Sequence, residues 1–155
     1  MDLHDNIITN TKDVFSSMLG MEVTPQEPVA AGMTHLKSIS GIIGLAGSVK
    51  GMLAVHAPEK TALAITSGFL GMAVEEINED VQDAIGELAN MLAGGVKLTL
   101  TENSSEIKLS VPSVIFGDTY NVSAPAKAMA FIIPFTIEGG LFYVEFHLIK
   151  EGLGK

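Results

Sequence analysis

The chain contains no cysteine, which excludes disulfides and metal sites built from thiolates. Positive charge is also scarce, because nine basic residues, all of them lysine, stand against eighteen acidic ones and give a net charge of −9. Such an acidic chain repels a phosphate backbone, and no basic patch with interleaved aromatic residues offsets this, so nucleic-acid binding is not expected. A surplus of negative charge suits a partner that presents lysine.

Long hydrophobic runs are missing too. No apolar stretch approaches the roughly 18 residues of a membrane span, and residues 1–11 lack the basic start and apolar middle of a signal peptide. We therefore expect a cytoplasmic protein that does not bind a membrane. With 155 residues, of which 47% are hydrophobic and 17% charged, the chain is predicted to form a single domain, 1–155, around a substantial core.

Hydrophobic periodicity divides the chain into helical and extended segments. Apolar residues return at helical spacing in three of them, which predicts helices at about 3–19, 58–71 and 77–101. Short apolar runs predict a hairpin over 39–57, strands at 107–111 and 112–116, and a hairpin that pairs 128–137 with 141–149. The fold class is therefore α+β, a largely antiparallel sheet packed against two long helices.

The two hairpins carry features that bear on packing. Glycines at 41, 44, 47 and 51 are unusual in strands and suggest bulges or the close packing of a helix on the sheet. Gly47 with Ser48 is expected at the first turn, and residues 138–140 at the second. The last strand is predicted to have a covered face and a wetter face, formed respectively by Phe142, Val144, Phe146 and Leu148 and by Tyr143, Glu145 and His147.

The helix predicted at 77–101 carries the most informative pattern. A helix turns by about 100° per residue, so most of its apolar residues share one broad arc. Asp83, Glu87, Asn90 and Gly94 lie on the opposite side, all within roughly 60° of one another. The helix should bury one face and present a narrow polar stripe on the other, flanked by Lys97.

A polar stripe is usually only the solvated side of an amphipathic helix, but two features favour a functional surface. Asparagine is a poor residue for an exposed helix interior, because its side chain competes for backbone hydrogen bonds. Gly86, Gly94 and Gly95 each cost about 1 kcal/mol of helix stability relative to alanine. A flat strip beside the Asn90 carboxamide suits close approach by another molecule, although tight packing of a second helix would also explain the glycines.

The run from Asp83 to Asn90 fits the pattern D-x-x-x-E-x-x-N, and it resembles the motif of the CheC/CheX/FliY phosphatases of bacterial chemotaxis. The glycine-rich hairpin at 41–57 and the segment 110–117 resemble the family too, and the likeness extends over about residues 3–150. CheC-type members carry the motif twice, whereas the helix at 58–71 has no E-x-x-N. The chain is therefore identified as a CheX-like member of this family.

The resemblance implies a phosphatase that hydrolyses the phospho-aspartate of a CheY-like response-regulator receiver in two-component signalling. It implies that Asn90 positions the attacking water and that Glu87 anchors a lysine of the receiver. Asp83, Gly86, Gly94 and Lys97 are expected to contact the partner, although Asp83 could instead pair with Lys97 or solvent. No cofactor is expected in this chain, since the receiver supplies its own divalent metal, Mg²⁺. The resemblance also implies a homodimer.

Other hypotheses remain open on the sequence. The same fold could be a non-catalytic module that binds a receiver or a motor protein, or a dimer that binds a small ligand. His4, His35, His56 and His147 have no cysteine neighbours and no i, i+4 pairing, and H-E-x-x-H is absent. We expect strand histidines such as His56 and His147 to be packed or at the surface rather than metal ligands.

Overall fold

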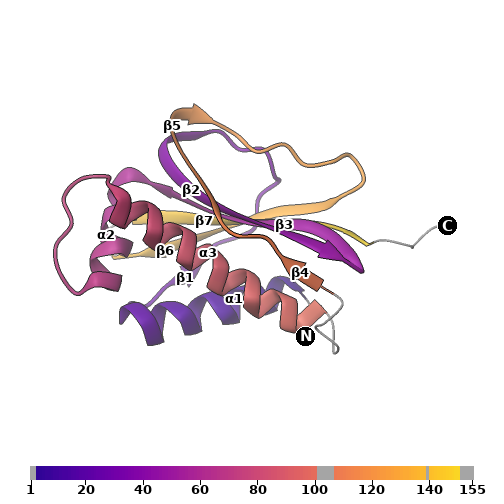
Figure 1. The fold of residues 1–155 in the computed structure, drawn as a ribbon, viewed down its shortest axis with the longest axis horizontal. Coiled ribbons are helices and arrows are strands. Elements are labelled where there is room, and N and C mark those ends of the chain that lie inside the picture. The colour runs from indigo at the N-terminus through magenta and orange to yellow at the C-terminus, as the bar shows by residue number, and fades with distance from the viewer. Residues whose placement is uncertain (1–2, 101–106, 139, 151–155) are drawn as a thin grey trace.

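The computed structural model describes residues 3–100, 107–138 and 140–150. Within these ranges one antiparallel sheet has its helices gathered on one side (Figure 1). The helices are α1 (Leu3–Val14), a short π-helical turn η1 (Phe15–Leu19), α2 (Glu59–Leu70) and α3 (Glu79–Leu100). The α+β prediction is confirmed.

The sheet runs in the order β1-β6-β7-β3-β2-β4, and β5 also pairs with β2. Its strands are β1 (Thr24–Pro25), β2 (His35–Gly47), β3 (Val49–Pro58), β4 (Ile107–Leu109), β5 (Ser113–Tyr120), β6 (Met129–Ile137) and β7 (Gly140–Lys150). The hairpins β2–β3 and β6–β7 are those predicted from the sequence. Position 101 of the predicted third helix and position 139 of the second turn lie outside the described residues.

Local capping chemistry sets the ends of the helices. The Asn78 side chain accepts a hydrogen bond from the backbone N–H of Val81 at 3.1 Å, so α3 begins at Glu79 and not at residue 77. The segment predicted as one helix over 3–19 passes from α1 into η1 and ends at Gly20, whose φ of 66° is the left-handed conformation that glycine adopts easily.

The core lies between the helices and the sheet. The largest fully buried side chains include Phe15, Phe135, Phe142, Ile85 and Leu88. The ring of Phe142 stacks on the rings of both Phe15 and Phe135, with centroid-to-centroid distances of 4.8 Å and 5.2 Å respectively. The apolar arc predicted for α3 is therefore the arc that the protein buries.

Gly41 explains how α3 can lie so close to β2. A Cβ built on Gly41 would stand 2.8 Å from the carbonyl oxygen of Ile85 and 3.3 Å from the Cβ of Ala89. The expectation of close helix packing on the glycine-rich hairpin is thus confirmed at this position. Gly95 serves a similar purpose between helices, because a Cβ there would overlap the Asn10 side chain of α1.

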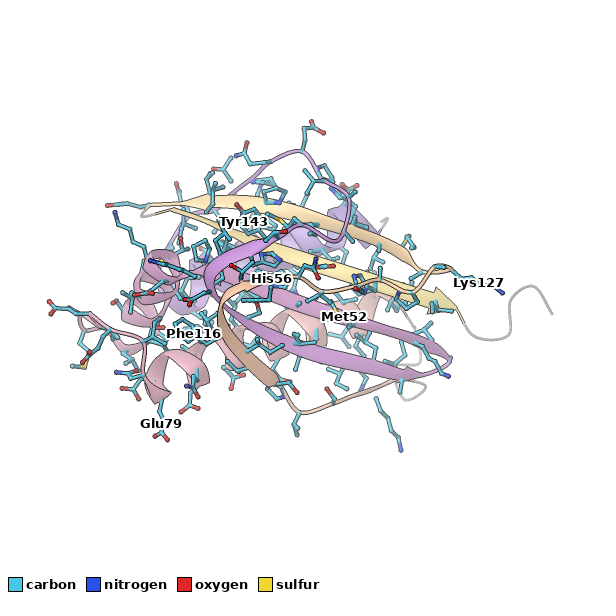
Figure 2. All side chains as sticks on the ribbon, turned by 90° about the horizontal axis from the view of Figure 1, so that it is seen from above. Met52, His56, Glu79, Phe116, Lys127 and Tyr143 are labelled. Atoms are coloured by element: carbon cyan, nitrogen blue, oxygen red, sulfur yellow. The ribbon has the colours of Figure 1, made fainter. Side chains whose placement is uncertain are left out.

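The far face of the sheet is drier than the alternation in the last strand predicted. Glu145 is 0% exposed, His147 is 3% exposed and Tyr143 is half-buried, so the expectation of a wetter face there is wrong. Segment 121–128 joins β5, beside β2, to β6, beyond β7. Its Ser123 and Pro125 lie beside His147, and Figure 2 looks onto this face. The crossing segment therefore keeps water away from a face of β7 that the alternation of apolar and polar residues predicted to be solvated.

No helix in the described part of the chain is both long and apolar enough to cross a membrane.

Candidate functional site

The polar stripe predicted on α3 is present and faces outward. Asp83, Glu87 and Asn90 are exposed, whereas Ile85 and Leu88 on the other side of the helix are fully buried. None of the three polar side chains forms a hydrogen bond or an ion pair with another described residue. They are therefore free to contact a second molecule without first breaking a contact within the chain.

A hollow of about 380 Å³ lies beside the stripe. One wall is α3 and the other is the start of β5 with the residue before it. The lining residues are Gln82, Asp83, Gly86, Glu87, Asn90, Pro112 and Val114. Glu87 and Asn90 are three residues apart on one helix face, so both side chains reach the same side of the hollow.

Gly86 is buried where α3 meets this second wall. A Cβ on Gly86 would lie 3.4 Å from Pro112 and 3.5 Å from Val114, which is ordinary contact distance. An alanine would therefore fit, but it would fill space between the two walls. The structure thus places Gly86 among the lining residues of the hollow and within the packing of α3 on β5.

The remaining residues expected to contact a partner lie outside the hollow. Gly94, one turn beyond Asn90, would have no atom within 4 Å of an added Cβ, so the helix surface is open there. Lys97 is half-buried near the end of α3. Asp83 and Lys97 are fourteen positions apart, or about 21 Å along a helix, so the alternative that they pair with each other is wrong.

Three lining residues were not predicted as site residues, namely Gln82, Pro112 and Val114. Pro112 and Val114 belong to the segment 110–117 that resembles the family, but nothing local ties this segment to α3. The sheet register does so, because Val114 pairs with Gly41 and Gly41 lies under Ile85 of α3. A sequence shows neither of these contacts directly.

The chemistry that this site offers is that of fixed polar groups. A carboxamide both donates and accepts hydrogen bonds, and a carboxylate accepts them and pairs with cations. The one group of three possible metal ligands found among the described residues, His35, His56 and Glu145, does not line this hollow. The stripe can therefore orient a water molecule and bind a cationic side chain. Positioning of this kind is what catalysis of phosphoryl transfer through a loose transition state mainly requires.

The exposed carboxylates of the region make the surface around the hollow negative. Glu79 and Asp80 lie in the first turn of α3, and Glu75 and Glu76 precede it; all four are exposed. Such a surface attracts a partner with basic side chains and speeds its association at low ionic strength.

Known proteins share both the sequence pattern and the fold. The family described as chemotaxis phosphatase CheX matches residues 39–136. The chain belongs to this family. The CheY-P phosphatase CheX of Thermotoga maritima is 28% identical over 115 residues, which cover 72% of this chain and 73% of that protein. The predictions of a CheX-like member and of a phosphatase are thereby confirmed.

Solved structures agree with this assignment. The chemotaxis protein CheX from Desulfovibrio desulfuricans has a TM-score of 0.83 and 30% identity, over 96% of this chain and 100% of that one. A CheX-CheY-BeF3-Mg²⁺ complex from Borrelia burgdorferi has a TM-score of 0.79 and 24% identity, over 95% of this chain and 97% of that one. The second of these likenesses concerns the fold alone.

Proposed function

We propose that this CheX-family protein hydrolyses the phospho-aspartate of a CheY-like receiver domain, with Asn90 positioning the water and Glu87 anchoring the receiver. The observation that carries the proposal is the placement of Glu87 and Asn90. Both are exposed, have no partner within the described chain, and lie at one hollow on one face of α3. The name of the Thermotoga maritima relative, CheY-P phosphatase CheX, supports the choice of substrate.

The proposed reaction needs no base in this chain. Water attacks the phosphorus while the bond to the aspartyl oxygen breaks, which yields the free aspartate and inorganic phosphate. The transition state is loose, so catalysis depends on positioning and on stabilisation of charge. The Asn90 carboxamide oxygen accepts a hydrogen bond from the water and directs its lone pair toward phosphorus. The receiver would supply its own divalent metal, Mg²⁺, whose charge would stabilise the phosphoryl oxygens.

Glu87 is proposed to hold the receiver in register. Its carboxylate would accept charge-assisted hydrogen bonds from a receiver lysine, a contact that is stronger than one between neutral groups. Asp83, Gly86, Gly94 and Lys97 would lie along the docking surface, with the open helix surface at Gly94 allowing close approach. The acidic side chains before and within the first turn of α3 support a basic partner.

We also propose that the protein acts in the cytoplasm as a homodimer. Strand β5 pairs with β2 and with no other described strand, and it exposes 42% of Ile115 and 51% of Phe116. Edge strands with exposed apolar side chains are suited to pair with another chain. Sedimentation equilibrium of the purified protein tests this, and a monomer at all micromolar concentrations would contradict it.

The decisive experiment measures phospho-aspartate decay in a receiver from the same organism. The receiver is loaded with acetyl phosphate and Mg²⁺, and the wild type is compared with Asn90→Ala and with Thr99→Ala. Thr99 is an exposed residue of α3 outside the hollow, which makes it a matched control. Loss of a fixed hydrogen-bonding group at a reacting centre should slow decay about 10²- to 10³-fold, and only in Asn90→Ala.

Receiver binding, measured by titration calorimetry on the same variants, separates the remaining outcomes. Binding by Asn90→Ala together with lost hydrolysis supports the proposed role of Asn90. Wild-type protein that binds the receiver without accelerating decay would instead indicate a non-catalytic receiver-binding module. Equal rates for wild type and Asn90→Ala would show that Asn90 does not position the water.

A further inference from the structure

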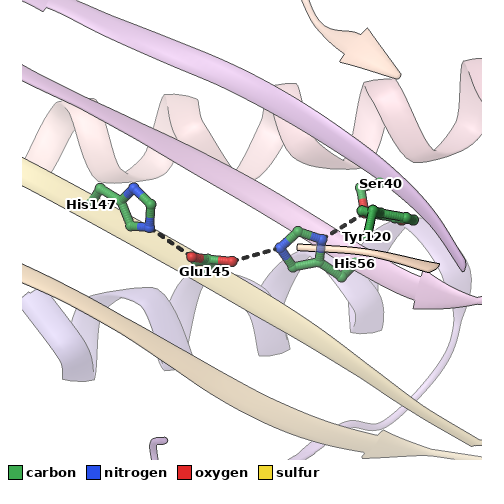
Figure 3. Close-up of polar contacts among 5 residues, drawn as sticks. All are labelled: Ser40, His56, Tyr120, Glu145 and His147. Atoms are coloured by element: carbon green, nitrogen blue, oxygen red, sulfur yellow. Dashed lines mark hydrogen bonds and ion pairs between the residues drawn. The ribbon is translucent and has the colours of Figure 1, made fainter. Parts of the chain in front are cut away.

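Three of the four histidines gather on the face of the sheet opposite α3. His35 of β2, His56 of β3 and Glu145 of β7 are all buried, and one possible ligand atom from each lies within 4.8 Å of the others. His147 of β7 adjoins Glu145. Figure 3 shows His56, Glu145 and His147 in one chain of polar contacts across the strands.

The backbone explains how residues so distant in sequence come together. His56 pairs with Ser40 of β2, and Glu145 pairs with Ala54, two residues before His56 on β3. Lys37 has a φ of 42°, an unusual conformation for a residue with a Cβ, and it interrupts the alternation of β2. The ring of His35 consequently stacks on that of His56, with centroids 3.8 Å apart.

The hydrogen bonds around His56 and Glu145 are those that commonly support metal ligands. His56 Nε2 contacts Glu145 Oε1 at 2.9 Å, while its Nδ1 contacts Ser40 Oγ at 2.6 Å. The second oxygen of Glu145 contacts His147 Nε2 at 2.6 Å, and Ser40 contacts the Tyr120 hydroxyl. In metal sites the second nitrogen of a ligating imidazole and the second oxygen of a ligating carboxylate are held in this way.

His35 is the member of the cluster that the hydrogen bonds leave unexplained. Its side chain is 3% exposed, and its Nε2 is buried without a hydrogen-bond partner. A buried polar atom in that state lowers the stability of the folded protein, because it has lost its hydrogen bonds to water without replacement. His35 also lines a hollow of about 190 Å³ with Thr34, Ser38 and Tyr143, which connects the cluster to the surface and leaves room for a water molecule.

We propose that His35, His56 and Glu145 bind a divalent transition metal ion of the zinc class. Two imidazoles and one carboxylate are a common ligand set for zinc, with water at a fourth position. The ion would take the place of the proton between His56 and Glu145. Their nitrogen and oxygen would move apart to roughly 3.3 Å, so that both can bind at about 2.0–2.1 Å in tetrahedral geometry.

The protonation states suit this role. Burial, together with the nearby charge of His56, lowers the pKa of His35 from 6.5 to about 4, so its imidazole is neutral at physiological pH. Burial alone would raise the pKa of Glu145, but hydrogen bonds from His56 and His147 outweigh it and lower the pKa. For these two groups the metal-binding forms, a neutral imidazole at His35 and a carboxylate at Glu145, are thus the forms present.

Metal binding also requires a rearrangement of the His35 side chain. Lone pairs of two parallel, stacked rings cannot converge on one ion, so His35 must turn out of its stack on His56. The His35 side chain makes no hydrogen bond with another described residue that would have to break, and the hollow beside it provides space. This proposal departs from the expectation, drawn from the sequence, that the strand histidines are packed residues and not ligands.

The test uses tag-free full-length protein, stripped with EDTA, dialysed, and titrated with Zn²⁺ alone in a calorimeter. The wild type should bind one ion per chain. His35→Ala should bind at least a hundredfold more weakly with an unchanged circular dichroism spectrum. Ser40→Ala, which removes support for His56, should weaken binding about 10- to 100-fold. His4→Ala, a change on α1 across the sheet, should bind as the wild type does.

Thermal unfolding provides a second measurement. Zn²⁺ should raise the melting temperature of the wild type and of His4→Ala, because the ion binds only the folded chain, and should leave that of His35→Ala unchanged. Two results would overturn the proposal. One is the absence of Zn²⁺ binding by the wild type at about 100 micromolar Zn²⁺; the other is equal affinity in the wild type and His35→Ala.

Discussion

Replacing Gly41 with alanine should force α3 away from the sheet. The added Cβ would stand 2.8 Å from the carbonyl oxygen of Ile85, and contacts under 3.0 Å essentially never occur for real Cβ atoms. Non-bonded atoms attract one another best near 3.5 Å, so the helix would have to withdraw by roughly 0.7 Å. The obstructing atom belongs to the backbone and cannot rotate away.

The expected loss of stability follows from two opposing terms. Overpacking of a well-packed core costs about 1–3 kcal/mol, whereas replacing glycine by alanine gains about 0.4–1 kcal/mol by restricting the unfolded chain. Gly41→Ala should therefore lower the free energy of unfolding by about 1–2 kcal/mol. Urea denaturation measures this as a lower midpoint with an unchanged m-value.

Gly44→Ala is the matched control on the same strand. Its added Cβ would meet the Ser110 hydroxyl at 3.6 Å, an ordinary contact, so stability should stay the same or rise slightly. Since α3 carries Glu87 and Asn90, withdrawal of the helix should also slow receiver dephosphorylation in Gly41→Ala but not in Gly44→Ala. Equal stability of the two variants would refute the argument that Gly41 is required for close packing of α3.

Four further substitutions test other parts of the structure. Glu87→Ala should raise the KM for the phosphorylated receiver at least about tenfold, because a charge pair covered in the complex loses one partner; an unchanged KM in the decay assay would contradict the anchoring role. Gly94→Ala should stabilise the protein to urea by about 1 kcal/mol through helix propensity, whereas Gly95→Ala should not, because its Cβ would displace the Asn10 side chain; equal gains would exclude this packing. Lys37→Gly should raise the free energy of unfolding by about 1 kcal/mol by relieving the positive φ, which appears as a higher urea midpoint; a lower midpoint would show that the conformation carries no strain.

The helices and hairpins were accessible from the sequence because their signals are local. Helical spacing defines the buried arc of α3, and the same arithmetic places Glu87 and Asn90 together on the outer side, as the structure does. Asn78 is a cap recognisable by residue type, so the start of α3 at Glu79 is also contained in the local sequence. The turn at Gly47 also lies between the predicted strands.

The second wall of the hollow depends on contacts between distant segments. Pro112 and Val114 reach α3 because β5 pairs with β2 and Gly41 brings β2 under the helix. Each step joins residues tens of positions apart, and no spacing rule along the chain expresses that proximity.

The far face of the sheet shows the same division. The alternation of the last strand correctly indicates which side chains share a face, since that follows from the two-residue period of a strand. Whether water reaches that face depends on the path of the 121–128 segment between β5 and β6. Sequence periodicity therefore set the direction in which Glu145 and His147 point, while the packing of distant strands buried them and brought His35 and His56 to their side.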